Sequence, residues 1–293
     1  MIRELAARVI LKADDYGNQA SGINELVEKG NLSSVGTLIA FTGKKEAEAL
    51  QQSVAVSPFR ETSIVLHTNF QSGYPVSGAE NVPSLVDDQG RFLRPRPIAT
   101  EWEIYRAQIN PDHVRRELDA QIEKFYHEFG YYPDALDSHN IILAVDPVAE
   151  IAMERAQQLA IPITFPYLYA DDFGPGPLAA QVVHTKLLEE YKRRGIKTAD
   201  YTYPNDNGNH IYLNSLPIEQ GTQKLLQGLQ ALQPGVTQIV FHPVHPKKPR
   251  IPSDTQEINR GRKRDYEMLS DPRVSAEIKI LHQQNRIASF KTL

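Results

Sequence analysis

The sequence predicts an α/β fold, a TIM-like (β/α) barrel of about seven strands that can be distorted from a regular ring. One domain is expected over residues 1–293. Three observations favour this class. Segments of strand and helix character alternate from one end of the chain to the other, which is typical of a parallel sheet covered by helices. The length of 293 residues suits one barrel. The composition stays even, with no repeat or linker that would indicate a second domain.

Short apolar runs bounded by turn residues predict the strands. The first predicted strand, residues 8–13, is typical. It contains the uninterrupted apolar run 9–11, and polar residues follow the strand at once. Further runs of this kind predict strands at residues 34–40, 63–66, 135–138, 161–165, 196–201, 237–241 and 287–290. Together with the helices between them, they make about seven β/α units, which fit a barrel better than two domains.

Helical periodicity and capping residues predict the intervening helices. The clearest helix begins at Asn110, a capping residue that precedes Pro111 in the first helical position, and it ends at Gly130. Apolar residues repeat at helical spacing within it, namely Val114, Leu118, Ile122, Phe125 and Phe129. Further helices are predicted at residues 18–29, 47–52, 146–160, 178–194, 225–232 and 270–284.

Two long stretches lack sustained periodicity and are expected to be irregular. Residues 70–97 and 166–177 are both rich in glycine and proline, and a shorter polar loop is expected at 203–209. Long loops inside a compact domain are usually functional. We therefore expect the loop at 70–97 to contribute to a site.

The composition excludes several functional classes. The net charge is −4, which gives no indication of a nucleic-acid-binding surface. The chain has no cysteine, which excludes disulfides, zinc–thiolate sites and thiol nucleophiles, so any metal must be held by His, Asp or Glu. No apolar run is long enough to span a membrane, and residues 1–7 lack the apolar core of a signal peptide, so a cytoplasmic location is expected.

Four of the predicted strands end in residues that can support chemistry. In a (β/α) barrel, polar side chains at the carboxyl ends of the strands point into the active site. The residues at these ends are Asp14, Asp15, His67, Asp137, His139, His242 and His245. Their common position predicts one shared site.

Each of these residues alone has a simpler explanation, since an Asp after a strand is most often a helix cap and a lone His is most often structural. Two adjacent carboxylates, Asp14 and Asp15, weaken that explanation. Like charges side by side are costly unless a cation or a proton lies between them. One Asp with two His makes a three-ligand set that leaves positions open for water and substrate. Such ligation suits Zn²⁺, Mn²⁺, Co²⁺ or Ni²⁺ better than Mg²⁺.

Metal-assisted hydrolysis also uses a base and an acid. Asp14 is available to accept the proton of an attacking water, and His242 is available to protonate a leaving amine. Weaker candidates for substrate contact are Asp137, His245 and His210, for which a structural or surface role is the simpler alternative.

Several segments resemble motifs of the YdjC-like carbohydrate deacetylases, the family that includes chitooligosaccharide deacetylase. The segment KADDYG at 12–17 resembles the N-A-D-D-F-G opening of the family, and LHTN at 66–69 resembles its G-x-H segment. LDSH at 136–139 matches its D-S-H motif, and FHP at 241–243 resembles its C-H-P motif. Residues 82–92 resemble a V-P-S-L-V-D-x-x-G-x-F stretch of some members. The segments occur in order over nearly the whole chain.

The resemblance implies a β/α barrel that hydrolyses the N-acetyl group of amino-sugar oligosaccharides with a divalent metal, often described as Mg²⁺. Carried over residue by residue, it implies that Asp15, His67 and His139 are the metal ligands. It makes Asp14 the base and His242 the acid or transition-state stabiliser. We therefore expect Mg²⁺ or Zn²⁺ as cofactor and a small molecule or oligosaccharide as partner. Barrels of this kind often dimerise, so a homodimer is compatible with the sequence.

Two positions depart from the family pattern. His139 is followed by residues 140–143 (NIIL), where members usually have further histidines, and Lys12 stands where an Asn is common. These departures leave two alternatives open. One is a metal-dependent hydrolase of another amide or ester, and the other is a non-catalytic carbohydrate-binding or regulatory relative.

Overall fold

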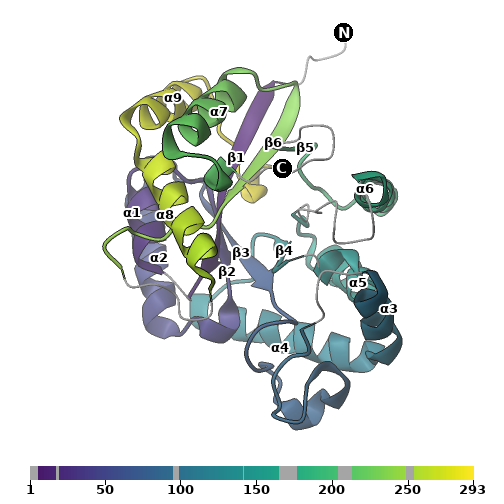
Figure 1. The fold of residues 1–293 in the computed structure, drawn as a ribbon. Coiled ribbons are helices and arrows are strands. Elements are labelled where there is room, and N and C mark those ends of the chain that lie inside the picture. Colours follow the sequence, from purple (N-terminus) through teal and green to yellow (C-terminus); the bar gives the residue numbers. More distant parts are fainter. Residues whose placement is uncertain are drawn as a thin grey trace.

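Six parallel strands form a curved half-barrel sheet in the computed structural model (Figure 1). The structure describes residues 6–17, 20–94, 99–140, 142–164, 177–203, 213–248 and 254–293. The strands are β1 (Ala7–Tyr16), β2 (Ser34–Thr37), β3 (Ser63–Thr68), β4 (Leu136–Ser138), β5 (Tyr201–Tyr203) and β6 (Gly235–Phe241). Their order across the sheet is β4-β3-β2-β1-β6-β5. Because the pairs are parallel, the carboxyl ends of the strands meet at one edge.

Strand β1 is the centre of this sheet, between β2 and β6. Its residues from Val9 to Tyr16 are all buried. The register sets Ala13 opposite both Val35 of β2 and Phe241 of β6. The residues that follow these positions therefore emerge at the same edge, which is where the sequence places the candidate site.

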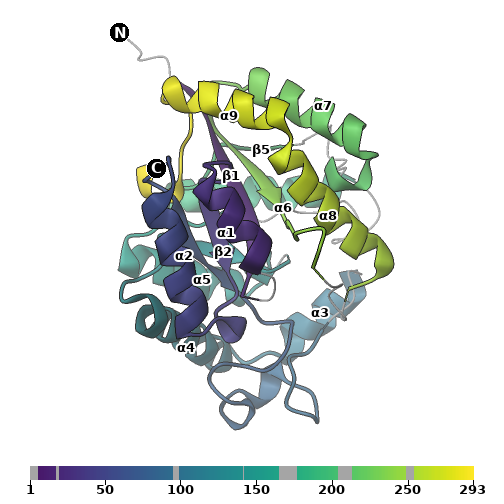
Figure 2. The same cartoon turned by 90° about the vertical axis from the view of Figure 1, so that its left-hand side faces the viewer.

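Helices cover the outer face of the sheet (Figures 1 and 2). They are α1 (Ala20–Glu28), α2 (Lys44–Val56), α3 (Ala99–Gln108), α4 (Pro111–Phe129), α5 (Val148–Leu159), α6 (Pro177–Arg193), α7 (Ile218–Gln230), α8 (Gln256–Ser270) and α9 (Pro272–Gln283). The apolar strand faces and the buried sides of these helices form the main core. This alternation of strand and helix confirms the predicted α/β class.

Helix α4 shows how closely local sequence signals determine an element. Asn110 caps it by accepting a hydrogen bond from the main-chain nitrogen of Asp112, 2.8 Å away. Pro111 occupies the first turn, and Gly130 ends the helix with a φ of 83°, in the left-handed region. The apolar residues that predicted the helix are on its buried side. The prediction for this element is confirmed.

The predicted ring of about seven strands is not complete in the described residues. A strand was predicted at 161–165, and the described residues 161–164 form no strand of their own, because Ile163 makes only one bridge, to Leu136 of β4. The main-chain nitrogen of Ile163 bonds instead to the carbonyl of Lys197, 3.1 Å away. The strand predicted at 287–290 is likewise a single bridge, from Ile287 to β1. These segments are too short to extend the sheet, so the barrel is a half-barrel.

Helices α3 and α8 were not predicted from the sequence. The buried side of α8 includes polar or small residues, among them Asn259, Gly261 and Asp265, so it has no continuous apolar periodicity. Its first turn is nevertheless capped, since Thr255 accepts a hydrogen bond from the main-chain nitrogen of Ile258 at 3.2 Å. A helix with a partly polar buried face is not visible to a search for apolar spacing.

The loop after β3 is irregular as predicted. Within residues 70–94 it contains two short 3₁₀ turns, Ala79–Asn81 and Pro83–Leu85, and one isolated bridge. Its path brings residues 71–73 and 91–94 to the strand ends. In the part of the chain that the structure describes, no helix has the length and apolar character needed to cross a bilayer.

Candidate metal and catalytic site

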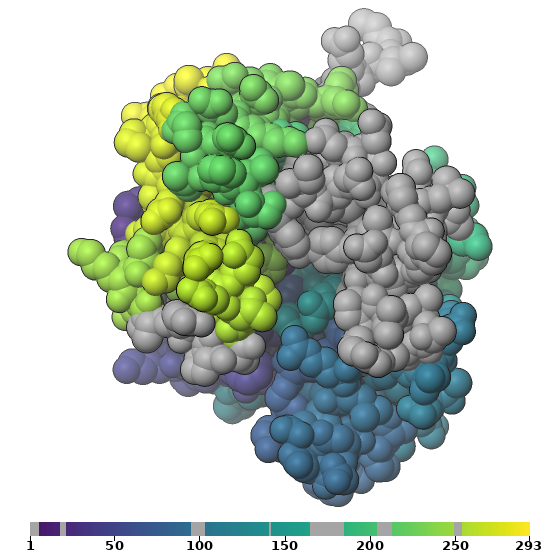
Figure 3. All heavy atoms as spheres, viewed as in Figure 1, coloured from purple at the N-terminus to yellow at the C-terminus, as the bar shows by residue number. Residues whose placement is uncertain are grey.

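A pocket of about 930 Å³ opens at the carboxyl ends of the strands. The space-filling view shows the surface hollowed between α8 and the segment after β3 (Figure 3). The pocket gathers most of the predicted site residues, namely Asp14, Asp15, His67, Asp137, His139 and His242. Side chains from four strands and the loops after them therefore share one cavity.

Asp14 and Asp15 both face this pocket although they are neighbours in one strand. Adjacent side chains of a regular strand point to opposite faces. Here the pairing of β1 with β2 is irregular between Ala13 and Tyr16, and Asp15 has a φ of 64°, in the left-handed region. Asp is one of the few residues that tolerate this conformation. The bulge therefore turns both carboxylates to the same side.

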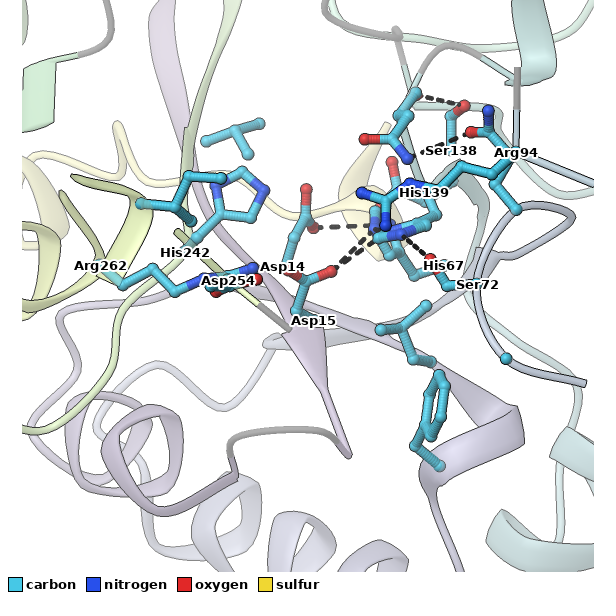
Figure 4. Close-up of a pocket in the computed structure, with 18 of the residues that line it drawn as sticks. Asp14, Asp15, His67, Ser72, Arg94, Ser138, His139, His242, Asp254 and Arg262 are labelled. Atoms are coloured by element: carbon cyan, nitrogen blue, oxygen red, sulfur yellow. Dashed lines mark hydrogen bonds and ion pairs between the residues drawn. The ribbon is translucent and has the colours of Figure 1, made fainter. Parts of the chain in front are cut away.

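Asp15, His67 and His139 bring three potential ligand atoms together (Figure 4). Asp15 Oδ1 lies 3.5 Å from His67 Nε2 and 3.3 Å from His139 Nδ1. The two ring nitrogens are 3.3 Å apart. Ligands about 2.1 Å from an ion, at tetrahedral or octahedral angles, are themselves about 3.0–3.5 Å apart. The three atoms thus have the spacing of one face of a metal's ligand sphere.

The chemistry of these atoms also fits a divalent metal. Asp15 Oδ1 is buried and accepts no hydrogen bond among the described residues. A buried charged oxygen that accepts no hydrogen bond is costly, and a cation beside it would reduce that cost. One carboxylate oxygen with two imidazole nitrogens is a ligand set that divalent transition metals accept.

The other nitrogen of each ring has a partner that orients it. His67 Nδ1 forms a short hydrogen bond with Asp137 Oδ2, and His139 Nε2 lies 3.1 Å from Ser72 Oγ. If these nitrogens carry the ring protons, His67 Nε2 and His139 Nδ1 keep their lone pairs toward Asp15. Ser72 and Asp137 are therefore placed to fix the rings.

Charged neighbours change the protonation of the candidate ligand residues. Burial alone would lower the pKa of His67, but the carboxylates of Asp14 and Asp137 raise it to about 10. Burial alone would raise the pKa of Asp15, yet His139, His67 and an arginine hold it well below its usual value. A cation that binds His67 Nε2 must therefore displace a proton.

Asp14 belongs to a buried charge network beside the three candidate ligand atoms. Lys12 Nζ lies 2.6 Å from Asp14 Oδ1 and 2.5 Å from Asp137 Oδ2, and all three side chains are almost fully buried. Burial and the charge of Asp137 raise the pKa of Asp14 to about 7, although Lys12 opposes the shift. Asp14 can therefore exchange a proton near neutral pH.

A glycine on β2 makes room for this network. A Cβ atom at Gly36 would lie 2.4 Å from Asp14 Oδ1 and 3.0 Å from Asp137 Oδ2. Real Cβ atoms essentially never show the first distance, and the second is tighter than most of their contacts. The carboxylates and the lysine can approach one another only because this position has no side chain.

His242 enters the pocket from the segment after β6. Its main-chain nitrogen donates a hydrogen bond to Asp265 Oδ2 at 2.8 Å. Burial lowers the pKa of the His242 ring to about 3, which Asp15 only partly opposes. The ring is therefore neutral at physiological pH and can donate one N–H hydrogen bond.

The weaker predicted contacts are placed differently. His245 is absent from the lining of the pocket, and it lies 3.9 Å from a carboxylate oxygen of Glu25 with its ring against Tyr266. Asp137 lines the pocket, but its carboxylate is engaged by Lys12, His67 and Thr164. The third candidate, His210, lies outside the described residues.

Two of the apolar residues after His139 do not form a wall of the pocket. Ile142 and Leu143 are buried in the main core, and Asn140 is the residue that lines the cavity beside His139. Asn140 Nδ2 donates a hydrogen bond to Gln71 Oε1 at 3.1 Å. The departure from the family pattern after His139 therefore leaves polar groups at the cavity surface.

Two residues of the site gave no signal in the sequence. Arg262 and Asp254 reach the pocket from α8 and from the segment before it. Their position depends on a helix that apolar spacing did not predict. Lys12 did give a signal, because a lysine within an apolar strand is unusual unless it is paired.

The sequence profile described as YdjC-like protein matches residues 8–279. The chain belongs to the YdjC-like family. The resemblance of its motifs to this family is therefore confirmed over nearly the whole chain. One relative of this YdjC-like protein is the chitooligosaccharide deacetylase of Proteus mirabilis, 28% identical over 223 residues, which are 68% of this chain and 82% of the relative.

Other similar proteins cover still more of the YdjC-like chain. The carbohydrate deacetylase of Danio rerio is 24% identical over 269 residues, which are 83% of each chain. A crystal structure from Enterococcus faecalis, named for a suggested role in cellobiose-phosphate cleavage, superposes with a TM-score of 0.73 at 22% identity. That comparison covers 97% of this chain and 98% of the other, so the two share a fold.

Proposed function

We propose that this YdjC-like protein is a metal-dependent carbohydrate deacetylase that removes N-acetyl groups from amino-sugar oligosaccharides. The relatives named as deacetylases support the reaction class, a hydrolysis of an amide bond. The observation that carries the proposal is the spacing of Asp15 Oδ1, His67 Nε2 and His139 Nδ1 in a pocket that also contains Asp14 and His242.

We propose Asp15, His67 and His139 as the residues that hold the metal. The chemistry that a divalent cation supplies when bound is Lewis acidity, which polarises a carbonyl and lowers the pKa of water. Two imidazoles among three ligands favour a transition metal such as Zn²⁺ over Mg²⁺, which prefers an all-oxygen octahedron.

Asp14 is proposed as the general base. Its pKa of about 7 suits proton exchange near neutral pH. The Asp14 carboxylate takes a proton from the attacking water as the C–O bond forms, and the amide C–N bond breaks when Asp14 returns that proton to the amine nitrogen. Lys12 holds one oxygen of this carboxylate at 2.6 Å and so fixes its direction.

His242 is proposed as a stabiliser of the transition state. Because burial lowers the pKa of its ring to about 3, the ring reaches the substrate neutral. A neutral imidazole can donate one N–H hydrogen bond to an oxygen that gains negative charge. Of the two roles expected for His242, this favours the stabiliser over a fully protonated acid.

The cavity suits an oligosaccharide. Its volume of about 930 Å³ is near the upper end of the range for small-molecule sites. Leu38, Phe41, Phe92 and Leu93 give it an apolar side, while Gln71 and Asn140 add amide groups. Sugar rings offer both an apolar face and polar edges.

The cytoplasmic location and the homodimer stay predictions from the sequence.

The proposal is tested by measuring metal content and acetate release in matched variants. Asp14→Asn should lower kcat on N-acetylated chitooligosaccharides about 10²–10⁴-fold because the base is lost, while metal content is kept because Asp14 is not one of the proposed ligands. His139→Ala should lose the metal as well. The control is His127→Ala, a histidine on α4 whose side chain is 83% exposed, which should change neither measurement.

The two measurements separate the parts of the proposal. Metal that stays bound in both His67→Ala and His139→Ala would contradict the ligand assignment. Wild-type protein that binds a metal but releases no acetate from any N-acetylated sugar would contradict the deacetylase reaction and favour hydrolysis of another amide or ester, or a binding role.

A further inference from the structure

We infer that Arg262 is a positioning residue, which orients the Asp15 carboxylate so that only one of its oxygens, Oδ1, is presented to the metal. The inference rests on the proposed metal site and goes beyond it, since it concerns a residue on α8 that none of the ligand motifs includes. Arg262 Nη2 lies 2.8 Å from Asp15 Oδ2, and its side chain is 12% exposed. In Figure 4, Arg262 lies on the opposite side of Asp15 from His67 and His139.

The two oxygens of Asp15 have different environments. Oδ2 accepts the charge-assisted hydrogen bond from Arg262, whereas Oδ1 is buried without a hydrogen bond and faces the two histidines. An unrestrained carboxylate can rotate and present either oxygen or both. The contact to Oδ2 removes that freedom, so the ligand atom is oriented before a cation arrives.

Asp254 in turn orients the guanidinium. Arg262 Nε donates to Asp254 Oδ2 at 2.6 Å, and the Asp254 side chain is 15% exposed. A guanidinium is planar and rigid, so fixing Nε also fixes the direction of Nη2. Lysine has a single ammonium on a flexible chain and cannot reproduce this fork geometry.

Helix α8 connects this arrangement to the other wall of the pocket. The carbonyl of Arg262 accepts a hydrogen bond from the main-chain nitrogen of Val244 at 3.0 Å. Three residues later, on the same side of the helix, Asp265 accepts one from the main-chain nitrogen of His242 at 2.8 Å. One turn of α8 thus holds both the ligand carboxylate on β1 and the segment that carries His242.

The test separates orientation from charge. Replacing Arg262 alone would add net negative charge beside the site and could attract a cation for that reason. The double variant Arg262→Met with Asp254→Asn removes the pair without changing the net charge. We expect it to bind Zn²⁺ about 10–100-fold more weakly in a chelator competition, because the outer contact of a ligand is lost. We also expect the visible spectrum of the Co²⁺-loaded protein to shift.

The matched control is an exposed pair with the same chemistry. Arg273 Nη1 lies 2.8 Å from Glu219 Oε1, and both side chains are at least half exposed. Arg273→Met with Glu219→Gln should bind Zn²⁺ with wild-type affinity. Arg262→Lys keeps the inference testable if the double variant misfolds, because it retains the positive charge but lacks the planar guanidinium. It should weaken Zn²⁺ binding several-fold at an unchanged melting temperature.

Wild-type affinity in the folded double variant, or in Arg262→Lys, would overturn the inference and leave the proposed metal site intact. Absence of metal from the wild-type protein would overturn both, so the two failures are distinguishable.

Discussion

At the scale of single residues, the site depends on charges that are buried and balanced. Lys12 would be unfavourable in the centre of a sheet on its own, because its ammonium is almost completely removed from water. Its contacts with Asp14 and Asp137 compensate that charge and at the same time keep the two carboxylates close to each other. The local fold therefore depends on the same residues as the proposed chemistry.

Gly36→Ala should disturb this network. The new Cβ would lie 2.4 Å from Asp14 Oδ1, and the short, ion-paired side chain has little room to move. We expect destabilisation of about 1–3 kcal/mol, the usual effect of overpacking, together with a fall in kcat of at least tenfold. Thermal unfolding and acetate release measure the two effects.

The control for this change is Gly43→Ala, at the start of α2, where the nearest contact of the added Cβ is 3.3 Å away. It should be close to wild type in both assays. A Gly36→Ala protein that was equally close to wild type would mean that the carboxylates can shift without loss.

At the scale of elements, α4 and α8 show two different origins of a helix. The apolar spacing and the caps of α4 are contained in its own residues, from Asn110 to Gly130. Helix α8 is held by polar contacts of its buried side, in which Asp265 accepts hydrogen bonds from His242 and Asn214. Such contacts join elements that are distant in the chain, so only the folded structure reveals them.

Asp265→Asn should change how stability depends on pH. Burial raises the pKa of Asp265 from 3.8 to about 7, so the folded protein retains a proton that the unfolded chain has already released above about pH 4. The stability that Asp265 contributes through this proton is fully present below pH 4 and is lost as pH rises through 7. The free energy of unfolding falls by up to about 1.4 kcal/mol per pH unit between these limits. Asn cannot titrate and should remove this slope.

Urea unfolding at pH 5, 6 and 7.5 measures this slope. The quantity compared is the difference in the free energy of unfolding between the wild type and Asp265→Asn. Other groups titrate in both proteins, and their effects cancel in that difference. A difference that stayed constant with pH would show that Asp265 does not titrate in this range.

At the scale of the whole molecule, the half-barrel brings distant parts of the chain to one edge. Asp15 and Arg262 are separated by 247 positions in the sequence, and His67 and His139 by 72. A cation that joined β1, β3 and the segment after β4 would therefore bridge parts of the sheet that fold from separate stretches of sequence. Its binding should stabilise the entire fold rather than one loop.

Metal addition should accordingly raise the melting temperature. At a free Zn²⁺ concentration of about 100 times Kd, mass action gives about 2.7 kcal/mol, which corresponds to a rise of several degrees for a chain of this size. Calorimetry with a metal buffer and with a chelator measures the shift. His139→Ala should show no rise, and an equal rise in that variant would place the cation elsewhere.

The sequence by itself determined the α/β class, helix α4 and the positions of Asp14, Asp15, His67 and His139 at strand ends. These features depend on local periodicity, on caps and on the rule that parallel strands end at one edge. The approach of Asp15 Oδ1 to within 3.3–3.5 Å of His67 and His139 was not deducible, because it depends on the bulge that turns Asp15. The open ring and the contacts of Ser72, Asp254 and Arg262 were decided by tertiary packing alone. Those contacts join separate elements, and no local pattern along the chain encodes which residues of distant elements meet.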